Sequence, residues 1–184
     1  MEKSPRIAVF CGSNDGSDLY VDAAIALGNA LLEFNIDLVY GAGARGLMGK
    51  LAKTVKDGGG YVVGVNPDRF HATGKHQMEN DEYIVVQTLQ ELKEIMISRA
   101  DAFIALPGGI GTLDEIMEVL SLRQLGFCDK PIGFLNIGSY YDRLLSFFEF
   151  MISEGFMRKQ DLDLFIVSEK PRELVIKILD LLKP

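Results

Sequence analysis

Short, continuously apolar runs recur along this chain, separated by longer segments in which apolar residues fall at helical spacing. The runs have the length of strands and lack strict alternation, which is typical of strands buried on both faces. Strands are therefore expected at Arg6–Cys11, Asp37–Tyr40, Tyr61–Val65, Glu82–Val86, Ala102–Leu106, Pro131–Leu135 and Leu164–Val167.

The intervening segments place apolar side chains three and four residues apart, which predicts amphipathic helices. Helices are expected over Asp18–Phe34, from Leu47 to the glycines at 58–60, over Leu89–Ala100, from Leu113 to about Gln124, over Ser139–Glu154 and over Lys170–Leu182. Residues 66–80 show no period and predict a polar loop. Alternating strands and helices predict one doubly wound, Rossmann-like α/β domain over residues 1–184, a parallel sheet with helices on both faces.

Charge and cysteine content narrow the classes of function. The 184 residues carry a formal net charge of −7, whereas nucleic-acid and membrane-surface binders normally present a basic face. We therefore expect neither nucleic acid nor membrane as a partner. Cys11 and Cys128 are too few for a disulfide scaffold, and we expect both to be reduced. Without a signal-peptide pattern or a membrane-spanning run, the sequence predicts a cytoplasmic protein.

Three loops that follow strands and precede helices are the candidates for a ligand site. They are Gly12–Ser17, Gly41–Gly46 and Pro107–Thr112. In a doubly wound sheet the ligand lies beyond the carboxyl ends of the strands, where the strand order reverses. All three loops should lie at that edge, and their convergence is stronger evidence than any one of them.

The turn at residues 107–112 is the most informative of the three. Pro107, Gly108, Gly109 and Gly111 end an apolar strand and open directly into a helix. Glycines let backbone N–H groups approach a ligand, and a helix start carries a positive dipole end, so the turn suits a phosphate or another small anion. Glu115 has two readings on the residues alone. With Thr112 it fits a capping box, and it is equally placed to be a catalytic carboxylate.

Other motifs favour less specific readings. Gly41-x-Gly43-x-x-Gly46 spells the dinucleotide fingerprint, but it occurs in the second strand–helix unit, and the chain has no room for a substrate domain. His71 and His76 share one loop without further ligands at metal-binding spacing, so we expect no metal site. Arg45, Lys50, Lys93 and Arg99 are the cations that could reach an anion at the sheet edge.

Residues 107–115 (Pro-Gly-Gly-Ile-Gly-Thr-Leu-Asp-Glu) resemble the P-G-G-x-G-T-x-x-E signature of the LOG (Lonely Guy) family. These enzymes are cytokinin riboside 5′-monophosphate phosphoribohydrolases, labelled possible lysine decarboxylases in older descriptions. The resemblance extends over nearly the whole chain. It includes, in order, Phe10–Ser13, Asp37–Gly41, Gly46–Gly49, Asp57–Gly59, Asp101–Leu106 and Glu154–Phe156.

The resemblance implies hydrolysis of the N-glycosidic bond of an AMP-like nucleoside 5′-monophosphate, with no metal and no cofactor. It implies that the Gly108–Thr112 turn holds the 5′-phosphate and that Glu115 is the catalytic carboxylate at the ribose. It also implies a homodimer, in a family whose sites lie near a subunit interface. The expected substrate-binding residues are Gly12, Ser13, Gly41, Gly43, Gly46, Lys93, Pro107, Gly108, Gly109, Gly111 and Thr112.

The chain departs from the family pattern next to the expected site. The family usually carries M-x-x-R-K before the central strand, and the matching residues 89–93 read Leu-Gln-Glu-Leu-Lys. Leu92 stands where the arginine belongs, and only Lys93 is kept. Lysine does not replace the bidentate geometry of a guanidinium, so a non-catalytic nucleotide-binding protein is the alternative function. A decarboxylase is not supported, because no lysine lies in a motif typical of a Schiff base.

Overall fold

The computed structural model describes residues 4–71 and 80–183, without the side chains of Phe70 and His71. Its centre is a seven-stranded sheet in the order β4-β3-β2-β1-β5-β6-β7, with every pair parallel. The strands are β1 (Arg6–Phe10), β2 (Asp37–Tyr40), β3 (Val62–Pro67), β4 (Glu82–Val86), β5 (Ala102–Ala105), β6 (Ile132–Leu135) and β7 (Ile166–Ser168). This sheet confirms the predicted α/β fold class.

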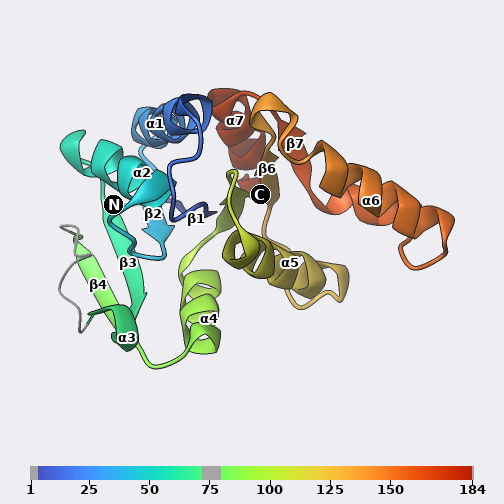
Figure 1. Cartoon of the computed structure of the whole chain (residues 1–184), viewed down its shortest axis with the longest axis horizontal. Helices are drawn as coiled ribbons and strands as arrows, with labels where there is room; N and C mark the ends of the chain where they lie inside the picture. The colour runs from blue at the N-terminus through green and yellow to red at the C-terminus, as the bar shows by residue number, and fades with distance from the viewer. Residues whose placement is uncertain (1–3, 72–79, 184) are drawn as a thin grey trace.

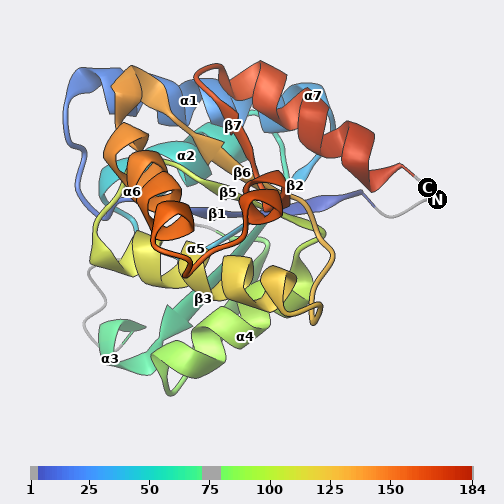
Figure 2. The same cartoon turned by 90° about the vertical axis from the view of Figure 1, so that its right-hand side faces the viewer.

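Helices cover both faces of the sheet, as Figures 1 and 2 show. The first face carries α1 (Asp18–Glu33), α2 (Gly46–Asp57) and α7 (Pro171–Leu182); the second carries α4 (Leu89–Arg99), α5 (Ile110–Gln124) and α6 (Asp142–Ser153). The central strands are buried on both sides, with alternate residues in the two cores: Ile7 and Val9 face one, Ala8 and Phe10 the other. No helix within the described residues is long and apolar enough to cross a membrane.

Three predicted segments differ most from the structure. Leu164, expected to begin the last strand, ends a 3₁₀ helix (Lys159–Leu164), and β7 begins at Ile166. Residues 66–71 were expected in a loop, but Asn66 and Pro67 extend β3 because they pair with Val85 and Val86 of β4, and α3 (Asp68–His71) follows. Residues 72–79 of that predicted loop, with His76, lie outside the described residues. The helix expected over Ser139–Glu154 is shorter. A 3₁₀ turn (Ile137–Ser139) precedes it, and positive φ angles at Gly138 and Ser139 keep the two apart.

The strand order reverses at β1. From β1 the sheet continues through β2 to β4 on one side and through β5 to β7 on the other. Phe10 of β1 pairs with Ala105 of β5, so the loops after these two strands leave the sheet side by side. The topology therefore places the Gly12–Ser17 loop and the Pro107–Thr112 turn together at the predicted switch point.

Candidate active site

The turn after β5 leaves backbone donors free. Helix α5 begins at Ile110 with Gly109 as its N-cap, and Leu113 N–H is the first amide bonded inside the helix (to Gly109 O, 3.1 Å). Among the described residues, none accepts a hydrogen bond from the amides of Ile110, Gly111 or Thr112. A Cβ at Gly111 would meet no atom within 4 Å. The turn thus presents donors at the positive end of a fifteen-residue helix to open space, which suits an anion.

After the Gly41–Gly46 turn, the amides of Leu47 and Met48 are occupied. At the start of α2, Leu47 N–H donates to Asn14 O (3.4 Å) and Met48 N–H donates to Gly12 O (3.3 Å). Gly46 has a φ of +63°, and a Cβ there would overlap the backbone of Ser13. Gly46 therefore serves a close contact between two loops, whereas Gly41 and Gly43 lie against the side chain of Met48. The structure therefore argues against a dinucleotide pyrophosphate at this helix start, although the letters fit the fingerprint.

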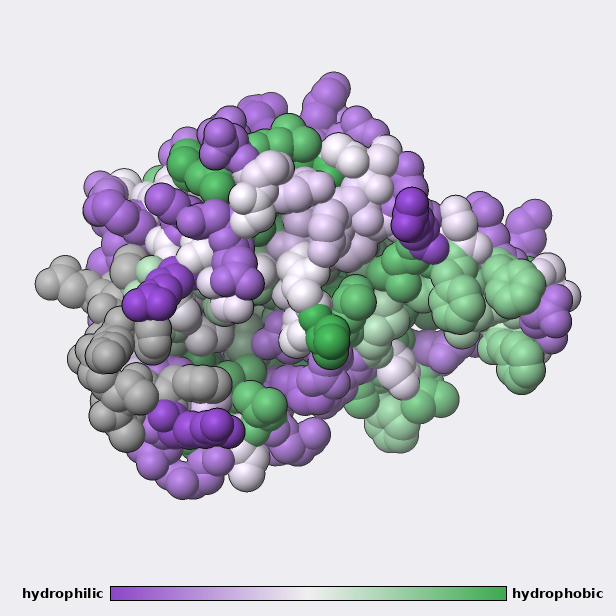
Figure 3. All heavy atoms as spheres, in the orientation of Figure 1, coloured by the Kyte–Doolittle hydropathy of each residue, from purple (hydrophilic) through white to green (hydrophobic). Residues whose placement is uncertain are grey.

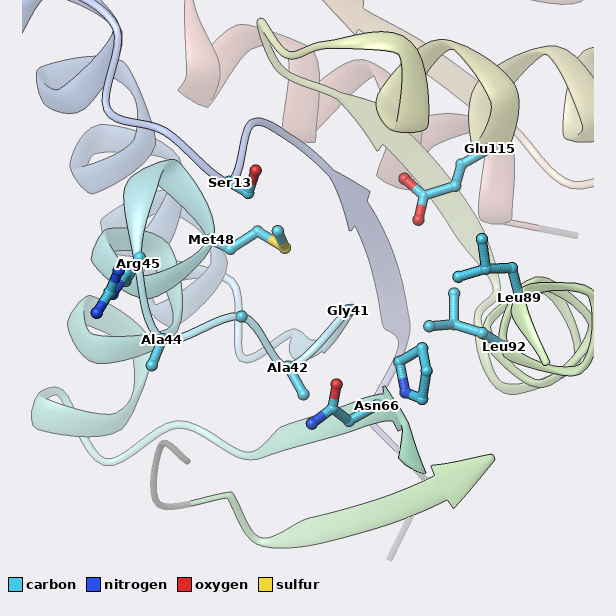
Figure 4. A pocket seen from close by; sticks show the side chains of 12 residues that line it. Ser13, Gly41, Ala42, Ala44, Arg45, Met48, Asn66, Leu89, Leu92 and Glu115 are labelled. Carbon is cyan, nitrogen blue, oxygen red and sulfur yellow. The ribbon is translucent and has the colours of Figure 1, made fainter. Parts of the chain in front are cut away.

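A cavity of about 320 Å³ opens between the β2–α2 turn and helices α4 and α5. We call it the Glu115 cavity (Figure 4). It is lined by Ser13, Gly41, Ala42, Gly43, Ala44, Arg45, Met48, Asn66, Pro67, Leu89, Leu92 and Glu115. Figure 4 shows the Glu115 side chain reaching into it from α5, beside Leu89 and Leu92 of α4 and opposite Ser13 and Met48. The lining of the cavity is predominantly apolar. Among the described lining residues, the Glu115 carboxylate is the one anionic group.

Burial changes the proton affinity of this carboxyl group. The pKa of Glu115 rises to about 7, first because burial disfavours its charged form and second because Asp114 lies near, while Lys93 opposes the rise. A carboxyl group with a pKa near neutrality can both take up and release a proton. The capping-box reading is wrong, because α5 begins at Ile110 and Thr112 is already its third residue. Glu115 is therefore not used as a helix cap.

The cations near the site are mostly engaged elsewhere. Lys93 contacts Glu118 (2.5 Å) and Asp114 (3.0 Å), and these two carboxylates of α5 hold its ammonium group. Arg99 pairs with Glu82 of β4 (2.9 Å). Arg45 is the single cation among the described residues that line the Glu115 cavity, and Figure 4 shows its side chain directed away from Glu115.

Two further cavities meet the Glu115 cavity at Ser13, which lines all three. The turn cavity, about 300 Å³, holds Gly12, Pro107, Gly108 and Gly109 together with Tyr20 and Tyr140. The Arg45 cavity, about 410 Å³, holds Gly46 together with Lys50 and Lys53.

Most of the predicted site residues are thus gathered at one edge of the sheet. Gly41, Gly43 and Glu115 line the first cavity, Gly12, Pro107, Gly108 and Gly109 the second, and Ser13 both. Thr112 is buried under the turn, where its side chain lies against Gly108. Gly111 stands in the first turn of α5. Lys93 is the exception, since its two acidic partners hold it outside these cavities.

Several residues of the site were not predicted. Met48, Asn66, Pro67 and Leu89 line the Glu115 cavity, and Tyr140 lines the turn cavity. Asn66 carried a usable signal, because it is a polar residue directly after an apolar strand at the carboxyl edge of the sheet. Tyr140 carried none, because it reaches the turn from 32 residues away in sequence.

The described residues contain no group of three His, Cys, Asp or Glu side chains that could hold a metal ion. The side chains of His71 and His76 lie outside the described part of the chain. The Cys11 thiol lies at the end of β1 and is buried, and burial raises its pKa above the ordinary range for cysteine. It is therefore a poor nucleophile.

Comparison with solved structures identifies the same fold. The molybdenum cofactor binding protein of Rippkaea orientalis superposes with a TM-score of 0.73, at 21% identity and over 98% of both chains. The Moco carrier protein of Chlamydomonas reinhardtii gives a TM-score of 0.74, also at 21% identity and 98% coverage of both chains. Identity at this level shows the shared fold and nothing about the ligand.

Sequence comparison is more specific. A family model described as "Possible lysine decarboxylase" matches residues 48–178. A cytokinin riboside 5′-monophosphate phosphoribohydrolase of Arabidopsis thaliana is 44% identical over 97% of this chain and 84% of its own length. The enzyme of that name from Oryza sativa subsp. japonica is 45% identical over 94% of this chain and 72% of its own. On this evidence the chain belongs to the LOG family.

Proposed function

We propose that this protein hydrolyses the N-glycosidic bond of an AMP-like nucleoside 5′-monophosphate, releasing the base and ribose 5-phosphate. The observation that carries the proposal is the placement of Glu115, which reaches into a largely apolar cavity with a pKa raised to about 7. Its helix begins at the turn whose amides are free. Related proteins that are 44% identical bear the name of this activity.

The reaction needs one proton acceptor and one stabiliser of positive charge. Water adds to C1′ of the ribose while the bond from C1′ to the base nitrogen breaks and its electron pair leaves with the base. Glu115 takes one proton from the water, and an equivalent proton reaches the departing nitrogen. As a carboxylate it also stabilises the oxocarbenium-like sugar. The free amides of Ile110, Gly111 and Thr112 would hold the 5′-phosphate.

A specific observation favours a second candidate, a nucleotide-binding protein that does not turn over its ligand. Leu92 faces the same cavity as Glu115, at the position where the family usually carries an arginine. Arg45 points away from the carboxylate. Negative charge that develops on the departing base would therefore find no stabilising guanidinium among the described residues on this side of the cavity.

The substitution Glu115→Gln separates the roles of the carboxylate. If Glu115 is catalytic, the variant should bind AMP with nearly unchanged affinity but release adenine at least ~100-fold more slowly. Glu118→Gln is the matched control, because it lies one turn further along α5 and pairs with Lys93 outside the cavity. Equal turnover in wild type and Glu115→Gln would remove Glu115 from the reaction.

Leu92→Arg decides between the two functions. For an active enzyme the new guanidinium should add little to adenine release. For a binding protein the wild type should be inactive, and Leu92→Arg should gain turnover that a second substitution, Glu115→Gln, then removes. That second pattern would overturn the proposed hydrolase.

We further propose that the protein is a homodimer and that a second copy covers the apolar surface of α6. Phe148 packs into the core, but Phe147 and Phe150 are 55% and 56% exposed, and Phe156 just beyond the helix is 82% exposed. Figure 3 shows this end of the molecule as a green, hydrophobic area. Monomers rarely leave such clusters in water, and self-complementary apolar faces are typical of twofold dimers.

Sedimentation velocity at micromolar concentration tests the dimer. The wild type should sediment as a dimer, and the double substitution Phe147→Ser/Phe150→Ser should shift it to the monomer. Leu181→Ser is the matched control, because Leu181 is equally exposed (56%) but lies on α7. A wild type that sediments only as a monomer would contradict the proposal.

A further inference from the structure

Three consecutive carbonyl groups of the Pro107–Thr112 turn region are each held by a donor from another part of the chain. Leu106 O accepts from the hydroxyl of Tyr141 (2.5 Å), Pro107 O from the amide of Gly12 (3.1 Å), and Gly108 O from the hydroxyl of Tyr140 (2.5 Å). No side chain of the turn itself is involved. The conformation of the turn is therefore set from outside, chiefly by two adjacent tyrosines.

The directions of these carbonyls bear on anion binding. In a trans peptide the C=O of one residue and the N–H of the next point in opposite directions, and the described residues contain no cis peptide. When Tyr140 draws the Gly108 carbonyl toward itself, the Gly109 amide is turned the other way. The Gly108 oxygen, which would repel an anion, is bound by the Tyr140 hydroxyl, and the Gly109 amide is left to face an anionic ligand.

The two tyrosines differ in their surroundings. Tyr141 is fully buried, and its ring packs edge-on against Phe134 of β6. Its hydroxyl satisfies the carbonyl at the end of a core strand, which is a contribution to stability. Tyr140 is 41% exposed and lines the turn cavity, with its ring edge-on to Tyr20 at 5.5 Å. Replacing its hydroxyl leaves these ring contacts and exposes Gly108 O to water, so the fold loses little.

We propose that Tyr140 is a positioning residue for the 5′-phosphate: its hydroxyl fixes the Gly108 carbonyl so that the amides from Gly109 to Thr112 face the ligand. This rests on the proposed function, because it assigns the phosphate to the turn. Tyr140 itself donates its proton to the turn and needs no contact with the substrate. Its contribution is the preorganisation of backbone donors.

The test is Tyr140→Phe with two product inhibitors of the proposed reaction as probes. Ribose 5-phosphate carries the phosphate, and free adenine does not. Losing one hydrogen bond should weaken inhibition by ribose 5-phosphate about 3- to 10-fold. Inhibition by adenine should stay unchanged, and KM for AMP should rise while kcat stays within about twofold. Tyr61→Phe is the matched control, because Tyr61 is equally exposed (40%) but lies before β3, away from the turn.

The outcomes separate this inference from the function on which it rests. Equal inhibition by ribose 5-phosphate in wild type and Tyr140→Phe would overturn the role of Tyr140 and leave the hydrolase standing. Weaker inhibition by both probes would also overturn it, because that result describes general damage to the site. A wild type that neither hydrolyses AMP nor binds ribose 5-phosphate would overturn both.

Discussion

Two glycine-rich turns flank the loop after β1 at the carboxyl edge of this sheet, and they use their glycines for different purposes. In the Gly41–Gly46 turn Gly46 lets two loops touch, and the amides of Leu47 and Met48 in α2 donate to Asn14 O and Gly12 O. In the Pro107–Thr112 turn the carbonyls are engaged and the amides at the start of α5 remain free. The Gly41–Gly46 turn matches the nucleotide fingerprint, but the helix after it has its amides bonded to protein. The Pro107–Thr112 turn does not match the fingerprint, and the helix after it has free amides.

The comparison shows which property of such a turn matters for binding. Glycine spacing reports only that the backbone comes close to something, whether protein or ligand. Whether each amide already has a partner within the protein decides whether the turn contacts protein or can bind a ligand. Substitutions in the two turns should therefore fail in different ways, and three predictions test this.

The largest effect is expected from Gly111→Val. A β-branched side chain at this position meets open space in the protein, so the variant should fold with a nearly unchanged melting temperature. The side chain would occupy the space of the ligand, and affinity for AMP should fall at least ~100-fold. Calorimetry of AMP binding measures the effect. Wild-type affinity in a folded Gly111→Val protein would remove the phosphate from this turn.

Gly46→Ala should produce the opposite failure, a loss of stability. The φ of +63° disfavours alanine, and its Cβ would overlap the backbone of Ser13 and Asn14. Together these should lower the free energy of unfolding by about 3 kcal/mol. Urea unfolding followed by circular dichroism measures this. Undiminished stability would show that the two loops separate easily and that the amides of α2 are available after all.

The smallest effect concerns Glu115 and pH. Its pKa is about 7 in the folded protein and near 4.5 when unfolded, so the folded state binds more protons between these values. Protonation of Glu115 makes its full contribution to the free energy of unfolding below about pH 4.5, and this contribution is lost as the pH rises through 7.

The measurement compares Glu115→Gln with wild type at pH 5 and pH 8.5. The variant should gain about 1–3 kcal/mol of unfolding free energy relative to wild type between these conditions. The Gly41–Gly46 turn carries no carboxylate and should contribute no such difference. A wild-type-to-variant difference that is independent of pH would mean that the pKa of Glu115 is not raised in the folded protein, and so would contradict a carboxyl group that takes up and releases a proton near neutrality.

The fold was readable from the sequence because parallel strands buried on both faces leave continuous apolar runs. Ala102–Leu106 and Arg6–Cys11 were expected as buried strands, and β5 and β1 are buried at the centre of the sheet. The ends of helices and strands were harder to predict where pairing with a distant strand decides them. Asn66 and Pro67 look like loop residues locally, and only their pairing with Val85 and Val86 makes them a strand.

The sequence could predict which loops follow the carboxyl ends of the strands and so lie at the site. It could not predict the parts of the site that depend on contacts between residues far apart in the chain. The glycines of the three loops follow from position alone, whereas the role expected for Glu115 came from the family resemblance. Lys93 was expected at the substrate, but only the structure shows that Asp114 and Glu118 hold its ammonium group. The apolar wall formed by Leu89, Pro67 and Met48 comes from three separate elements, and no local pattern announces it.

Gly12 connects the two turns, because its amide donates to Pro107 O while its carbonyl accepts from the amide of Met48. The amides of Gly12 and Met48 can exchange their hydrogens with solvent only when these contacts open. Opening either contact strains the other through the single residue Gly12, so both amides should exchange at similar rates. A phosphate bound at the start of α5 would then slow exchange at Met48, in a helix that it does not touch.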